Sequence, residues 1–121
     1  MKMFPTLLPF ALIATHAVAT PLAEGCALRM SEIGSMVTVQ GAVDPQDWPR
    51  GSYEMTIEAR QGGNRSLSQQ AGKFDNESAQ TADGLFVLST TKVYVSNGGS
   101  LAVTLRVEDG DRNVSCSLDY N

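Results

Sequence analysis

Residues 53–60 read Tyr-Glu-Met-Thr-Ile-Glu-Ala-Arg, and this alternation of apolar and polar side chains decides the fold class. Successive side chains of a β-strand point to opposite faces, so the apolar residues of this segment share one face. One apolar and one polar face are typical of an antiparallel sheet that packs on a core from one side. The segment therefore predicts a half-buried strand of an all-β protein.

The same period of two continues on both sides of this strand, and no segment has the 3.6-residue period of an amphipathic helix. Turn sequences such as Gly62-Gly63 separate the segments, and residues 75–84 are predicted as a polar loop. About seven strands at short spacing favour an immunoglobulin-like antiparallel β-sandwich. We expect the strands in residues 26–30, 36–43, 53–60, 64–74, 85–95 (one long or two short strands), 101–108 and 114–120.

The first nineteen residues are typical of a secretory signal peptide. Lys2 supplies the positive charge, residues 4–13 form a short apolar stretch, and Ala17-Val18-Ala19 is a small-x-small cleavage site. Cleavage after Ala19 leaves one domain, residues 20–121. The apolar stretch is shorter than the roughly 20 residues that a transmembrane helix needs. We therefore expect an exported protein that does not span the membrane.

Composition excludes several classes of function. Nine Lys and Arg against thirteen Asp and Glu give a net charge of −4, the wrong sign for binding a nucleic-acid backbone. The single histidine, His16, lies in the predicted signal peptide, so no imidazole is left for Ser-His or Cys-His catalysis or for a zinc site. The sequence thus predicts no catalytic residue, no metal and no cofactor.

The two cysteines, Cys26 and Cys116, lie near the two ends of the predicted domain. In an oxidising compartment such a pair most simply forms a structural disulfide. Because the bond closes nearly the whole domain into a loop, it is worth roughly 4 to 5 kcal/mol in unfolded-chain entropy. The alternative is a redox-active pair. The cysteines lack the C-x-x-C or C-x-C spacing of such pairs, which argues against it.

The segment around the Gly-Gly turn resembles a known family. Residues 58–74 follow the pattern Glu-x-Arg-x-Gly-Gly-Asn-x-Ser-x-Ser-x-Gln-x-Gly-x-Phe, preceded by Gly51-x-Tyr53 and followed by the strand from Leu101 and by Cys116. This pattern resembles the CsgH-like branch of the periplasmic curli inhibitors, the CsgC and CsgH group. The resemblance implies a small immunoglobulin-like sandwich in the periplasm, whose partner is the curli major subunit and which keeps that subunit from forming amyloid before secretion. We also expect the protein to be a monomer.

A candidate client-binding surface lies on the strand after the Gly-Gly turn and its neighbour. The hydroxyl and amide side chains there match the hydrogen-bonding groups of amyloid ladders, and two arginines flanking the turn offer a positive patch to a client carboxylate. The alternative is an ordinary solvated sheet face. The predicted client-binding residues are Arg60, Arg65, Ser66, Ser68, Gln69 and Gln70.

Two other classes of function stay open, since a sandwich fold does not fix function. The first is an adhesive or subunit module of a surface assembly. The second is a carbohydrate-binding module that uses Trp48 and Tyr94 as stacking platforms. Trp48 lies in the loop of residues 44–50, where its other role is to cover one end of the core.

Overall fold

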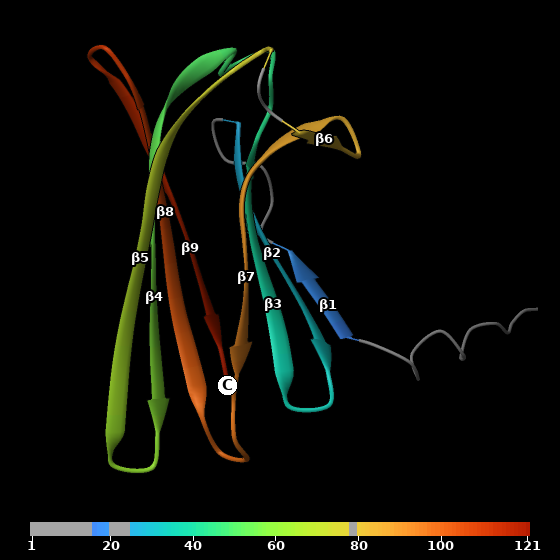
Figure 1. The fold of residues 1–121 in the computed structure, drawn as a ribbon, viewed down its shortest axis with the longest axis vertical. Coiled ribbons are helices and arrows are strands. Elements are labelled where there is room, and N and C mark those ends of the chain that lie inside the picture. Colours follow the sequence, from blue (N-terminus) through green and yellow to red (C-terminus); the bar gives the residue numbers. More distant parts are fainter. Residues whose placement is uncertain (1–15, 20–24, 78–79) are drawn as a thin grey trace, which may run out of the picture.

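A computed structural model describes residues 16–19, 25–77 and 80–121, and all nine strands found there pair antiparallel in two sheets (Figure 1). Sheet I has the order β1-β2-β3-β7-β6, and sheet II has the order β5-β4-β8-β9. None of the described residues forms a helix long and apolar enough to cross a membrane. The strands are β1 (His16–Ala19), β2 (Cys26–Ile33), β3 (Met36–Val43), β4 (Arg50–Gln61), β5 (Asn64–Asp75), β6 (Gln80–Ala82), β7 (Leu85–Tyr94), β8 (Ser100–Asp109) and β9 (Arg112–Tyr120).

The core lies between the two sheets, where the alternating apolar side chains of facing strands meet. Strand β8 shows the alternation most clearly, because every second residue from Leu101 to Val107 is buried and the residues between are exposed. Burial of one such side chain contributes about 1.5 to 3 kcal/mol. The buried residues of the main cluster include Leu28, Met30, Val37, Val39, Val43, Met55, Ile57, Leu101, Val103, Leu105 and Val107.

Gly41 lets the centre of sheet I approach sheet II closely. A Cβ atom at this position would lie 3.2 Å from Cδ2 of Leu105 and 3.3 Å from Sδ of Met55. The pairing of β3 with β7 shifts between Gly41 and Ala42, which is the signature of a β-bulge. The glycine therefore serves the packing of two core side chains of the opposite sheet.

A disulfide ties the first long strand to the last. Cys26 of β2 and Cys116 of β9 are both buried, their Cα atoms are 6.1 Å apart, and 90 positions separate them in the sequence. This Cα distance falls in the range that an ordinary disulfide spans. The bond joins sheet I to sheet II on the side where β2 faces β9.

Trp48 closes one end of the core. Its side chain is 2% exposed, and the guanidinium carbon of Arg112 lies 4.2 Å from its ring centroid. Arg112 also donates through Nη1 to the carbonyl oxygen of Asp47 at 3.0 Å, which holds the guanidinium over the ring. Trp48 therefore covers the core, and its burial contradicts the alternative in which Trp48 stacks on a carbohydrate.

The predicted strands are all present, and two short strands join them. In the predicted segment 85–95 there is one long strand rather than two, and it ends at Tyr94. Strand β6 lies in residues 75–84, which the sequence predicts as loop, and pairs only with the start of β7. Strand β1 lies at the end of the predicted signal peptide, whose residues 1–15 are outside the described residues.

Candidate functional site

The alternation of β5 divides the six predicted client-binding residues between its two faces. Cross-strand partners share a face, and on β4 the buried residues are Met55, Ile57 and Ala59. Their partners on β5 are Gln70, Ser68 and Ser66, which therefore lie on the core-facing side. Arg60, Arg65 and Gln69 lie on the outer face of sheet II, with Arg60 directly opposite Arg65. The six residues do not form one surface, because strand periodicity separates odd from even positions.

Glu58 stands between the two arginines on the outer face. Its Oε2 lies 3.2 Å from Nη2 of Arg60 and also pairs with Nε of Arg65. The arginine side chains are 64% and 61% exposed, against 22% for Glu58. Exposed ion pairs of this kind contribute little to the stability of a fold. The cluster of Arg60, Glu58 and Arg65, called the arginine clamp below, therefore carries one net positive charge and leaves guanidinium donors toward solvent.

The arginine clamp lowers the pKa of Glu58 below its ordinary value of 4.5. Partial burial of the carboxyl acts in the opposite direction, but the hydrogen bonds and charges of Arg65 and Arg60 outweigh it. A carboxyl with a lowered pKa in the folded state stabilises the fold above its unfolded-state pKa. This contribution is lost as the pH falls below 4.5 and through the folded-state pKa.

We expect the Glu58 carboxyl to titrate below pH 4.5 in a carbon-detected NMR titration of the folded protein. In the Arg65→Gln variant the midpoint should rise, because one hydrogen bond and one positive charge are removed. The Arg106→Gln variant is the control, since Arg106 pairs with Glu108 instead. A wild-type midpoint at or above 4.5, or no change in Arg65→Gln, would show that the clamp does not form.

Leu67 adds an apolar side chain to this face, which the sequence prediction missed. It is 57% exposed and lies directly opposite Glu58 on the outer face of β5. The only signal in the sequence is a leucine at an outward position of a strand rich in Ser and Gln. The outer face of the β4–β5 hairpin thus combines the arginine clamp, one exposed leucine and the amide of Gln69.

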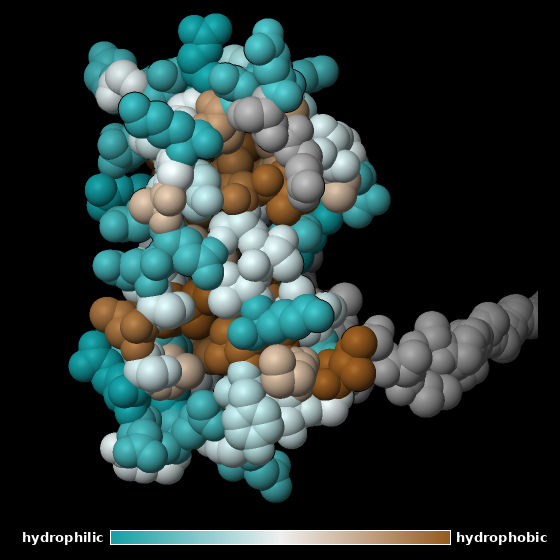
Figure 2. All heavy atoms as spheres, viewed as in Figure 1, coloured by the Kyte–Doolittle hydropathy of each residue, from teal (hydrophilic) through white to brown (hydrophobic). Residues whose placement is uncertain are grey.

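Gln70 has a structural role at the open side of the sandwich. Its Nε2 donates to Oγ1 of Thr91, and its Oε1 accepts from Oγ of Ser89. Both partners belong to β7, so Gln70 links the edge strand of sheet II to sheet I. Figure 2 shows hydrophobic core atoms along the seam between the two sheets, bordered by hydrophilic side chains. Gln70 is therefore engaged in hydrogen bonds within the domain.

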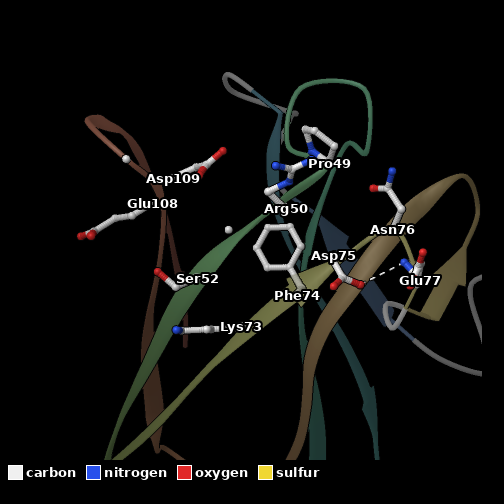
Figure 3. Close-up of a pocket in the computed structure, with 12 residues that line it drawn as sticks. Pro49, Arg50, Ser52, Lys73, Phe74, Asp75, Asn76, Glu77, Glu108 and Asp109 are labelled. Atoms are coloured by element: carbon white, nitrogen blue, oxygen red, sulfur yellow. Dashed lines mark hydrogen bonds between the residues drawn. The ribbon is translucent and has the colours of Figure 1, made fainter.

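A hollow of about 810 Å³ lies at the end of the sandwich near the start of β4 and the end of β5 (Figure 3). The ring of Phe74 points into it, and charged residues of both signs surround it, among them Lys73 and Glu108. The Asp75 carboxylate accepts from the backbone N–H of Glu77 at 3.0 Å, which is a turn contact. In the part of the chain that the structure describes, no three His, Cys, Asp or Glu residues are grouped to hold a metal ion.

Comparison with known proteins assigns the chain to a family. The sequence profile of the CsgH protein family matches residues 25–119, which is most of the chain. The solution structure of R. palustris CsgH is similar with a TM-score of 0.63 and 24% identity, covering 78% of this chain and 90% of that one.

The E. coli curli protein CsgC is similar with a TM-score of 0.60 and 13% identity, covering 78% of this chain and 97% of that one. No curated protein sequence matched. At these identities the two structures show a shared fold alone. The profile match covers every strand of both sheets except β1 and the last residue of β9, Tyr120. The chain belongs to the CsgH family of curli-associated proteins.

Proposed function

We propose that this protein is a periplasmic, monomeric inhibitor of amyloid formation by a curli major subunit. The observation that carries the proposal is the CsgH family match over residues 25–119. The similar fold of a protein described as a curli protein, CsgC, supports it. The inhibitor acts on nascent nuclei or fibril ends, which are the rare species on which amyloid growth depends.

The physical basis is a rigid domain that offers hydrogen-bonding and charged groups to a growing strand edge. Amyloid extends by adding strands to exposed edges, so an inhibitor must contact an edge without becoming a template. Charged side chains on long strands discourage further sheet addition. On the outer face of β4 and β5, the arginine clamp supplies positive charge and Leu67 supplies apolar contact. We assign client binding to this face.

Removal of the positive charge from the clamp is expected to weaken inhibition. In the Arg60→Gln/Arg65→Gln variant, about three- to tenfold more protein should be needed for the same lag in curli subunit fibrillation, which corresponds to about 0.7–1.4 kcal/mol. Glutamine is preferred to glutamate because a glutamate pair would place two further carboxylates beside that of Glu58. The free energy of unfolding should change by less than about 1 kcal/mol.

The matched control is Lys73→Gln/Arg106→Gln, which removes two positive charges from the same outer face away from the clamp. This variant should inhibit like the wild type. Equal inhibition by a folded Arg60→Gln/Arg65→Gln variant would refute the clamp as the client site. Equal weakening by both double variants would show that only the total charge of the face matters.

A further inference from the structure

Strand β1 occupies an edge that removal of the predicted signal peptide would vacate. Four residues of β1 pair antiparallel with β2, from His16 opposite Glu32 to Ala19 opposite Arg29 (Figure 1). All four lie before the predicted cleavage site after Ala19. In the processed chain β2 is therefore the edge strand of sheet I, and its outward backbone N–H and C=O groups have lost their partners.

The β2 edge lacks several of the features that protect edge strands from pairing. Its eight residues contain no proline or glycine and pair with β3 without a bulge. Of its two charged side chains, Arg29 lies on the outer face of the sheet and Glu32 on the side of Leu28 and Met30. Arg29 pairs with Asp83 at 3.2 Å, and Glu32 lines a small hollow together with Tyr120. The positive charge of Arg29 is therefore partly balanced by Asp83 before a strand is added.

A row of exposed apolar side chains continues from the end of this edge. Ile33 lies directly opposite Met36, and Met36 lies directly opposite Tyr94, so the three share one face across β2, β3 and β7. Their side chains are 68%, 41% and 59% exposed. Among the described residues, one further large apolar side chain is exposed, that of Leu67. A strand added to β2 and extended one residue beyond β1 would place a side chain against Ile33.

We propose that the β2 edge, Arg29–Ile33, is a second binding site that captures an extended, unfolded polypeptide segment by antiparallel strand addition. The segment that it accepts carries small or β-branched residues opposite Arg29–Ser31, as Ala-Val-Ala does in β1, and an apolar residue opposite Ile33. The identification of the bound segment as part of a curli subunit rests on the proposed function. Strand addition itself rests on the observed pairing.

Peptide titration tests the site directly. The probes are acetyl-Thr-His-Ala-Val-Ala-amide, which corresponds to residues 15–19, and the same peptide with Leu in place of Thr. Added to the ¹⁵N-labelled chain of residues 20–121, which contains every residue of the core cluster and the disulfide, they should shift the amide resonances of Arg29–Ile33. The Leu peptide should bind about two- to fivefold more tightly, because it forms a cross-strand apolar pair with Ile33.

The Ile33→Asp variant should lose this preference for the Leu peptide. The Leu67→Asp variant should keep it, since Leu67 has similar exposure but lies on sheet II. Absence of amide shifts along β2 at millimolar peptide, or shifts along β5 or β9 instead, would overturn the proposal.

A chain that retains β1 distinguishes a failure of this inference from a failure of the proposed function. In a chain of residues 15–121 the short linker keeps β1 at millimolar effective concentration beside β2, so the amides of Arg29–Glu32 that face β1 should exchange their hydrogens at least about twofold more slowly than in residues 20–121. The longer chain should also prolong the lag of curli subunit fibrillation less. In this longer chain, Ala17→Pro/Val18→Pro should restore fast amide exchange in β2 and the full extension of the lag. One of two adjacent amides in a strand must face β2, so one of the two prolines removes a hydrogen-bond donor from the pairing.

Equal inhibition by both chains, despite protected β2 amides, would refute the edge as a client site and leave the proposed function intact. Unprotected β2 amides in the longer chain would refute strand addition itself. If the chain of residues 20–121 fails to inhibit, the proposed function fails, and the peptide titration alone decides whether the edge binds extended chains.

Discussion

Replacement of both cysteines, in the Cys26→Ala/Cys116→Ala variant, is expected to lower the free energy of unfolding by about 4–5 kcal/mol. The bond joins residues 90 positions apart, so its removal frees almost the whole domain in the unfolded state. Domains of this size are stable by only about 5–15 kcal/mol. Urea unfolding monitored by Trp48 fluorescence measures the loss, because this indole leaves a buried site on unfolding.

The neighbouring Ser115→Ala/Ser117→Ala variant is the control for changes on β9. Both serines are exposed, so its stability should stay within about 0.5 kcal/mol of the wild type. Dithiothreitol should lower the stability of the wild type to that of the cysteine variant and leave the cysteine variant unchanged. A loss below about 1 kcal/mol would contradict the view that the β2–β9 bond is a principal constraint on the fold.

The Trp48→Ala variant is expected to lose about 3–5 kcal/mol of stability. The indole is buried at the end of the core, and its removal leaves a cavity under Arg112. Thermal and urea unfolding by circular dichroism measure the change, since the variant lacks the tryptophan signal.

Arg112→Ala is the matched variant, because it removes the covering guanidinium and keeps the ring. Its expected loss is about 1 kcal/mol, from one cation–π contact and the hydrogen bond to Asp47. Similar small losses in both variants would show that Trp48 is not part of the core. Retained stability of Trp48→Ala would then reopen a binding role for the indole.

The sequence correctly predicts those strands that bury one face against long strands of the opposite sheet. On β4 and β8, alternation in the sequence and alternation of burial coincide, because these are interior strands of sheet II. The bounds of β3, Met36–Val43, also match the prediction, since the Gly34-Ser35 turn before it and the Asp44-Pro45 loop after it mark both ends. The pairing of the cysteines is predicted from their number and from the expected export of the protein.

Features that depend on strand order cannot be predicted from a single sequence. Strand β6 has three residues, too few to show a period, and forms only because β7 offers it an edge. Strand β5 is an edge strand, and only its register with β4 shows that Ser66, Ser68 and Gln70 face the core side. The sequence identifies the positive patch at the Gly-Gly turn, but the partial neutralisation by Glu58 depends on how the side chains pack.

Fibrillation of a purified curli major subunit, followed by thioflavin-T fluorescence, tests the inhibitor account most directly. The oxidised chain of residues 20–121 is added at well below one molecule per subunit. The account predicts a lengthened lag at these ratios, since too little inhibitor is present to sequester monomers and it must act on nuclei or fibril ends. An unchanged lag, even at equal concentration with protein verified as folded and oxidised, would contradict it.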